Sequence, residues 1–142
     1  MYAVQTQELP LMEFTQEADA RARVRGAFPL YRDTGAASTA VVYFELAPGD
    51  RLARHVDSAE ELLVVLAGEA EATVGDETGR VRAGGIVLVP SMVPHEVRNT
   101  GTETLRIAGC FSSNTIVSVF DEEIAEAGGR VLGTPPPALA MA

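Results

Sequence analysis

The chain has 142 residues, of which 46% are hydrophobic, so it is long and apolar enough for one domain with a single core and too apolar for a disordered chain. Its formal net charge is −9, which makes nucleic acids and acidic lipid surfaces poor partners, because both attract clustered positive charge. Every basic residue apart from the two histidines is Arg, which excludes Schiff-base chemistry on Lys and the phosphate-binding Lys of a P-loop.

Three features of the sequence favour a cytoplasmic location. The N-terminal residues MYAVQTQELP lack a basic segment followed by an apolar one, so no signal peptide is expected. The longest uninterrupted apolar run, residues 62–67, is far shorter than the ~20 residues of a membrane-spanning helix. Cys110 is the only cysteine, which rules out an internal disulfide.

Residues 1–37 are expected to form an N-terminal arm outside the main fold. Within this arm, residues 15–25 fit either a short helix or an extended segment. Arg21, Arg23 and Arg25 alternate as they would on the solvent-exposed face of a strand, which indicates a solvated face rather than a binding patch.

Between residues 38 and 120, short runs rich in β-branched residues alternate with turn-forming Gly, Pro, Asp and Asn. The runs are 40–46, 51–57, 61–66, 69–74, 80–82, 86–89, 95–98, 104–111 and 116–120. Apolar residues at helical spacing are missing from this part of the chain. Strands that recur at intervals of roughly 8–12 residues indicate an all-β sandwich or barrel.

Residues 121–142 are expected to form a C-terminal tail. The tail begins with DEEIAEAGG, an acidic segment that fits a short helix, and ends in a Pro- and Ala-rich stretch. We expect this stretch to be poorly ordered or to lie against a partner subunit. The whole chain is thus predicted to be one domain, with an arm, a β-barrel over residues 38–120 and a tail.

Candidate metal ligands lie around the first histidine. Residues two apart on a strand share a face, so His55 and Asp57 are expected to point into the same cavity. Glu61 begins the next apolar run, and a hairpin between the two runs would place Glu61 opposite His55. These three residues are therefore candidate ligands of one site.

The second histidine, His95, shares its strand face with Val97, while the charged Glu96 and Arg98 face the other way. This pattern predicts that His95 points inward. Two imidazoles and one or two carboxylates are costly to bury together unless they bind a cation. Nitrogen and oxygen ligands suit one divalent transition metal ion, and Fe, Mn, Zn, Ni and Cu all remain open.

Two sequence motifs resemble those of the cupin family, G-x5-H-x-H-x3,4-E-x6-G and G-x5-P-x-G-x2-H-x3-N. The corresponding segments are Gly49-DRLAR-His55-V-Asp57-SAE-Glu61-LLVVLA-Gly68 and Gly84-GIVLV-Pro90-S-Met92-VP-His95-EVR-Asn99. The spacing agrees at every step, and the departures are Asp57 in place of the usual second His and Met92 in place of the usual Gly. We expect Met92 to pack near the barrel as a soft apolar contact.

The resemblance implies a small single-domain jelly-roll barrel of roughly six to eight strands with the metal inside. It also implies that His55, Glu61 and His95 bind the metal, and that the protein is a homodimer. It implies no particular reaction, because one fold supports many chemistries.

The role of Asp57 has three interpretations. An Asp oxygen reaches about 2 Å less far from Cβ than the Nε2 of a His. Asp57 is therefore either a fourth ligand, a residue that acts through water or orients His55, or only part of a turn with Ser58. Without Asp57 the ligands form the 2-His-1-carboxylate set of non-haem Fe(II) oxygenases, whereas with it two carboxylates balance the charge of the ion.

These observations favour a metal-dependent enzyme that acts on a small organic substrate, and we lean towards an Fe(II)-type dioxygenase. In this interpretation Asp57 is the candidate catalytic residue, as a fourth ligand or as a proton acceptor. A redox-neutral isomerase or lyase is the alternative, and turnover without oxygen would distinguish the two. A non-catalytic protein that binds a metal or a small ligand is the third hypothesis.

Overall fold

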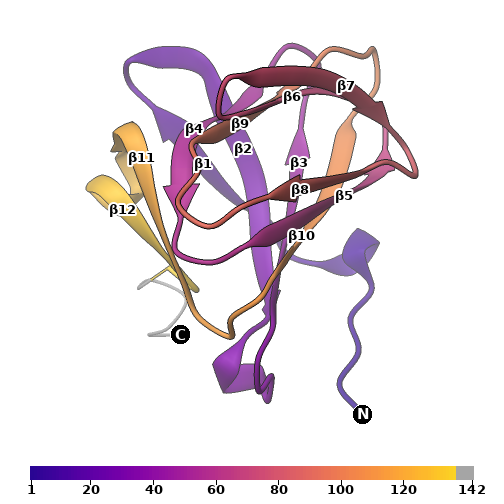
Figure 1. The fold of residues 1–142 in the computed structure, drawn as a ribbon, viewed down its shortest axis with the longest axis vertical. Coiled ribbons are helices and arrows are strands. Elements are labelled where there is room, and N and C mark those ends of the chain that lie inside the picture. Colours follow the sequence, from indigo (N-terminus) through magenta and orange to yellow (C-terminus); the bar gives the residue numbers. More distant parts are fainter. Residues whose placement is uncertain (137–142) are drawn as a thin grey trace.

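The computed structural model describes residues 1–136 and consists almost entirely of β-strands (Figure 1). The strands are β1 (Met12–Gln16), β2 (Asp19–Leu30), β3 (Ala40–Leu46), β4 (Arg51–Asp57), β5 (Glu61–Ala67), β6 (Glu69–Val74), β7 (Glu77–Arg82), β8 (Ile86–Val89), β9 (His95–Asn99), β10 (Leu105–Phe111), β11 (Ile116–Ile124) and β12 (Gly129–Thr134). The helices are the short 3-10 turns η1 (Thr6–Glu8), η2 (Arg32–Thr34) and η3 (Ala125–Ala127). Among the described residues, no helix has the length and apolar character to cross a membrane.

Two antiparallel sheets of six strands each enclose the interior. The strand order is β1-β2-β3-β10-β5-β8 in the first sheet and β12-β11-β4-β9-β6-β7 in the second. The predicted all-β jelly-roll fold is therefore confirmed. Strands β3, β4, β6 and β8 have the predicted bounds, because their alternating β-branched residues fit a pleated, half-buried surface.

The N-terminal segment differs from the expected arm. Strand β2 pairs with β3 and β1 pairs with β2, so both belong to the first sheet. Arg21, Arg23 and Arg25 are exposed as predicted, while Ala22 on the opposite face is buried. The described residues thus form twelve strands rather than six to eight, because both ends of the chain add strands to the sheets.

The C-terminal segment also differs from its expected form. Residues 121–124 continue strand β11 instead of forming a helix, and β12 pairs with β11. Ile124 is 4% exposed and packs in the same cluster as Phe120, since residues four apart on a strand share a face. The Pro- and Ala-rich tail lies, from residue 137 onward, outside the described residues.

Two of the three groups of buried side chains in the described interior differ in character. The first, called the aliphatic cluster, comprises Phe44, Leu46, Leu63, Val65, Ala70, Val89, Val97, Leu105 and Ile107. The second, called the aromatic cluster, comprises Phe14, Ala22, Ala53, Phe120 and Ile124, with Phe28 packed against it. The candidate metal ligands adjoin the aromatic cluster, because the ring of Phe120 stacks on the ring of His55.

Candidate metal centre

The two histidines lie on neighbouring strands of the second sheet. Strand β4 pairs with β9, and a β-bulge between Leu52 and His55 brings His55 directly opposite His95. The centroids of the two imidazole rings are 4.2 Å apart. The bulge therefore turns two residues that are 40 positions apart in sequence into adjacent side chains.

In each imidazole ring, the Nδ1 atom, which lies farther from the site than Nε2, donates a hydrogen bond to a backbone carbonyl. The Nδ1 of His55 lies 2.7 Å from the Ala53 carbonyl oxygen, and the Nδ1 of His95 lies 3.0 Å from the Val93 carbonyl oxygen. A carbonyl only accepts hydrogen bonds, so Nδ1 carries the hydrogen and Nε2 of the neutral ring keeps a free lone pair. Metal-binding histidines are oriented in this way.

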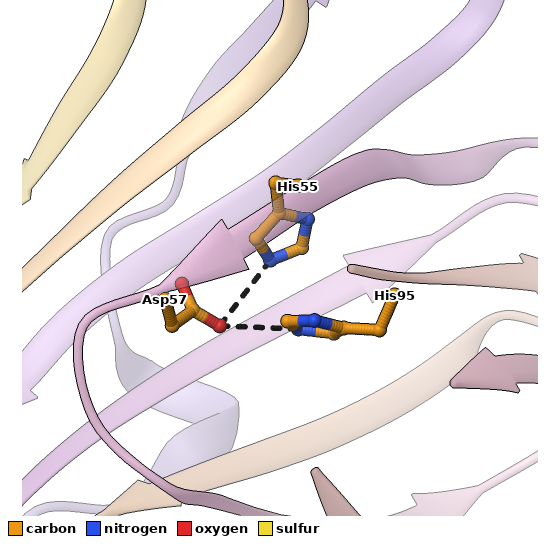
Figure 2. Close-up of side chains that lie close together, drawn as sticks. All are labelled: His55, Asp57 and His95. Carbon is orange, nitrogen blue, oxygen red and sulfur yellow. Dashed lines mark ion pairs between the residues drawn. The ribbon is translucent and has the colours of Figure 1, made fainter. Parts of the chain in front are cut away.

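Both Nε2 atoms face the carboxylate of Asp57 (Figure 2). The Asp57 Oδ2 atom lies 3.1 Å from His95 Nε2 and 3.5 Å from His55 Nε2. One ligand atom from each of the three residues lies within 4.8 Å of the others, and all three residues are buried. Asp57 therefore reaches the site in spite of its short side chain.

Two atoms of this triad fit a metal ion because they lack any other partner. Asp57 Oδ2 and His95 Nε2 are buried and lie 3.1 Å apart, and neither has a hydrogen-bond partner outside the site. Buried polar atoms are costly to leave unpaired, and a carboxylate with two imidazoles is a common donor set for divalent transition metals. The buried triad of His55, Asp57 and His95 can hold a metal ion.

Glu61 approaches the triad from the opposite sheet. Its Oε1 atom lies 3.5 Å from His95 Nε2, and the residue is 3% exposed. The predicted hairpin between the two runs is wrong, because β4 belongs to the second sheet and β5 to the first. Gly109 on β10 leaves the space that the Glu61 carboxylate occupies, since a Cβ atom there would collide with Oε2.

The charges of the site are strongly coupled. Burial disfavours the ionised form of Asp57, but its contacts with His55 and His95 outweigh burial and hold its pKa well below the usual range. Burial, with the charge of Asp57, raises the pKa of Glu61. Burial opposes protonation of His95, yet contacts with Asp57 and Glu61 raise its pKa to about 10. In the metal-free protein His95 therefore holds a proton that a metal ion must displace.

Two residues of strand β11 complete the site and were not identified from the sequence. Ser118 lies opposite Asp57, and its hydroxyl donates a hydrogen bond of 2.5 Å to Asp57 Oδ1. Phe120 stacks on His55 with a centroid distance of 4.5 Å. The available signal was the alternation of Ile116, Ser118 and Phe120, which puts a polar residue on the inward face of an apolar strand.

The loop before β9 fixes the backbone of Asp57, because the Met92 N–H donates to the Asp57 carbonyl at 2.9 Å. The Met92 side chain is 60% exposed, so the expected packing near the barrel is wrong. Its φ of 64° lies in the left-handed region, which glycine adopts without strain. This backbone conformation explains why the motif usually has Gly at this position.

The remaining motif residues shape the chain around the site. Gly49, Gly68 and Gly84 all have φ between 84° and 90°, as the turn interpretation of these glycines requires. The buried Asn99 amide donates hydrogen bonds of 2.8 Å to the carbonyl oxygens of Leu46 and Glu103. The second motif thus ends in a residue that ties β9 to strand β3 of the other sheet and to the loop before β10.

A cavity of about 80 Å³ opens beside the candidate ligands. His55, Asp57 and Glu61 contribute to its wall, together with the aromatic cluster and residues of β12. Its apolar lining includes Phe14, Phe28, Val42, Phe111, Ile124 and Leu132. A small, largely apolar molecule in this cavity would lie next to the triad.

This all-β fold with a buried His/Asp/His triad defines a small barrel protein with a candidate metal centre. Residues 42–112 match the family model described as Cupin domain, and the chain belongs to this family. All four predicted ligands fall within the matched segment. No curated protein matches the sequence.

Three solved structures illustrate the similarity of the fold. Lactobacillus farciminis oxalate decarboxylase in a formate complex is 19% identical, with a TM-score of 0.67, and the match covers 78% of this chain and 33% of the decarboxylase. A proposed sugar phosphate isomerase from Acidithiobacillus ferrooxidans is 19% identical, with a TM-score of 0.62 and coverage of 80% and 75%. Bacillus subtilis oxalate decarboxylase, described with Mn(II) centres, is 23% identical, with a TM-score of 0.61 and coverage of 70% and 28%. The chain thus spans about a third of the length of each decarboxylase.

Proposed function

We propose that this chain is a metal-dependent enzyme that acts on a small organic molecule in the cavity beside His55, Asp57 and His95. The observation that carries the proposal is the convergence of Asp57 Oδ2, His55 Nε2 and His95 Nε2, buried together in a triad that borders a largely apolar cavity. Buried ionisable groups with shifted pKa values that cluster beside a cavity are typical of functional sites.

The proposed ligands are His55, Asp57 and His95, with Glu61 as a fourth. One divalent ion among Fe, Mn, Zn, Ni and Cu suits this set, and the Mn(II) centres described for the B. subtilis decarboxylase support such an ion in this fold. When bound, the ion would act as a Lewis acid towards a substrate oxygen and, if it were iron, would also react with O2.

The side chains of the site have separate roles in this proposal. Ser118 and the two backbone carbonyls fix the orientation of Asp57 and the histidines. Burial raises the pKa of Glu61, so whenever its carboxyl group does not bind the ion it can hold a proton close to His95. Asp57 accepts a proton if it is not fully engaged as a ligand. The apolar wall limits the access of water to these groups.

Two reaction classes fit this arrangement. A 2-His-1-carboxylate set with room for substrate favours an Fe(II)-type dioxygenase, which is the leading proposal. Adjacent carboxyl groups that differ in pKa favour a redox-neutral isomerase or lyase as the second. The decarboxylase and isomerase descriptions of the similar structures support the second class.

The experiment combines metal analysis with a substrate screen. Purified protein is analysed for metal content, stripped with a chelator and reloaded separately with each candidate ion. Each form is then screened against small enols, diketones, phenols and hydroxy acids, with and without O2. Turnover that requires O2 supports the dioxygenase, and anaerobic turnover supports the isomerase or lyase. A folded protein that binds none of the ions contradicts both proposals and leaves a non-catalytic ligand-binding protein.

The predicted homodimer, the cytoplasmic location and the absence of nucleic-acid and membrane partners remain predictions. A sedimentation mass of two chains at micromolar concentration is expected. A mass of one chain would contradict the predicted assembly.

A further inference from the structure

Gln16 is a second polar feature of the cavity, separate from the candidate metal ligands. It lies at the end of β1, lines the same cavity as His55 and Asp57, and is 5% exposed. Both the nitrogen and the oxygen of its carboxamide are buried without a hydrogen-bond partner in the described structure. Protein interiors rarely leave such a group unpaired unless a ligand or an ordered water completes it.

The orientation of Gln16 is imposed by its neighbours. Thr15 faces the other side of β1, where its N–H and hydroxyl both donate to the Glu126 carboxylate, at 2.6 and 2.8 Å. Gln16 shares the inward face with Phe14, two residues earlier, which belongs to the aromatic cluster. Glu126 therefore holds the end of the strand so that the carboxamide stays on the cavity side.

We propose that Gln16 is a ligand-recognition residue that binds a neutral polar group of the molecule held in this cavity. The inference rests on the proposed function in one respect: the same molecule would extend from the candidate metal centre to Gln16. A carboxamide offers both an acceptor and two donors, so the matching group must both donate and accept hydrogen bonds, as a primary amide or a hydroxyl does.

The charges around the cavity favour a neutral group. Arg51, the one arginine among the lining residues, already pairs with Asp19 and Glu96, at 2.9 and 3.1 Å. A carboxylate of the ligand would thus meet no free arginine and would leave the Gln16 oxygen unpaired. The volume of about 80 Å³ limits the ligand to a small molecule, because a cavity of about 150 Å³ in another protein holds benzene.

The test uses two probes of the same shape, propionamide and butan-2-one, which differ by an NH2 in place of a CH3. Binding of each is measured by NMR titration, in protein stripped of metal and in protein loaded with Mn(II). We expect propionamide to bind the wild type at least about tenfold more tightly than butan-2-one, because a hydrogen-bonding site rejects an analogue that leaves it unpaired. Equal binding of the two probes would overturn the proposal.

The variant Gln16→Met keeps the length of the side chain and removes the carboxamide. We expect it to lose the preference for propionamide and to melt at the same temperature as the wild type or higher, because it removes an unpaired buried amide. Glu13→Gln, on the exposed side of the same strand, is the control and should retain the preference. A lower melting temperature for Gln16→Met with an unchanged preference would show a structural residue and overturn the proposal.

The metal-free arm separates this inference from the proposed function. A preference for propionamide in stripped protein supports recognition by Gln16 whether or not the metal contributes. If the protein binds no metal but still prefers propionamide, the proposed enzyme function fails while the recognition site stands. A crystal structure of the free protein could show both carboxamide atoms hydrogen-bonded to a backbone group or an enclosed water. That result, together with equal binding of the two probes, would contradict recognition by Gln16 while leaving the proposed enzyme function untouched.

Discussion

The aliphatic cluster and the candidate metal centre lie between the same two sheets, but the first buries apolar side chains and the second buries ionisable ones. In the aliphatic cluster, residues such as Leu46, Val97 and Ile107 are at most 1% exposed and pack against other apolar side chains. Around the triad, Asp57 and His95 are buried almost as deeply, yet their ionisable groups face each other and have no hydrogen-bond partner outside the site. The comparison indicates that the first region stabilises the fold, whereas the second buries ionisable groups that a bound metal ion would stabilise.

The largest expected effect is the loss of metal from the variant His95→Ala. The Nε2 atom of His95 is the imidazole nitrogen nearest to Asp57. Its removal should weaken metal binding by more than about 100-fold, which exceeds the loss of affinity typical for residues that only support a ligand. Elemental analysis and a competition titration with a chelator measure the effect. Glu60→Ala, at an exposed position beside Glu61, is the control and should keep its metal. If the folded His95→Ala protein kept its metal content, His95 would not be a ligand, and the proposed difference between the aliphatic cluster and the candidate metal centre would be wrong.

The opposite result is expected for Ile107→Ala in the aliphatic cluster. The substitution leaves a cavity in a packed core and should lower the free energy of unfolding by about 2–5 kcal/mol. Metal affinity of the folded variant should stay within about twofold of the wild type, because Ile107 belongs to a cluster that includes none of the proposed ligands. Chemical denaturation of the stripped protein, alongside the chelator titration, checks both parts. A large drop in metal affinity would show that the two regions are coupled.

A smaller effect on metal binding is expected for Ser118→Ala. The Ser118 hydroxyl donates to Asp57 Oδ1, and loss of such a supporting hydrogen bond typically weakens metal binding by about 10–100-fold. Ser112→Ala, at an exposed position in the same part of the chain, serves as the control. An unchanged affinity for Ser118→Ala would indicate that Asp57 needs no support from β11 and would weaken its assignment as a ligand.

The pH dependence of metal binding should follow the proton on His95. In the metal-free protein the pKa of His95 is raised to about 10, so below that pH the ion must displace one proton. The apparent affinity should therefore rise with pH, by at most about tenfold per unit, and level off near pH 10. Calorimetry in buffers of different ionisation enthalpy measures the released proton. Affinity that is independent of pH between 6 and 9 would argue against His95 as a ligand.

The smallest expected effect concerns Met92, which lies outside both regions. A residue other than glycine in the left-handed conformation costs about 1–2 kcal/mol, and glycine carries an entropic cost of about 0.5–1 kcal/mol. Met92→Gly should therefore stabilise the protein by about 0.5–1 kcal/mol without changing metal affinity, because the side chain is exposed. Thermal denaturation in the absence of metal gives the measurement. A destabilised variant would mean that the Met92 side chain contributes a contact in solution.

The central strands and the common direction of His55 and Asp57 were predictable from the sequence because both depend on local patterns. The two-residue alternation that makes β4 a strand also points His55 and Asp57 to one side. The sheet partners were not predictable, because pairing joins residues far apart in the chain. Thus Glu61 was assigned to a hairpin with β4, although it faces the triad from the other sheet.

The strands at the ends of the chain were harder to predict for a different reason. The segment 121–124 contains Glu residues that favour helices, yet the inward positions of Phe120 and Ile124 extend the strand instead. Packing against the rest of the barrel overrides such local preferences. Gln16 was missed because nothing in the sequence around it shows that its strand closes the cavity.

The added terminal strands have a consequence for how the site could diversify. The four candidate ligands fall within residues 42–112, whereas Phe14, Gln16 and the β12 part of the wall come from outside that segment. Changes near the chain ends can therefore reshape the cavity while the segment with the candidate ligands stays intact. Exchange of these terminal segments with those of other cupins therefore offers a route to altered ligand choice.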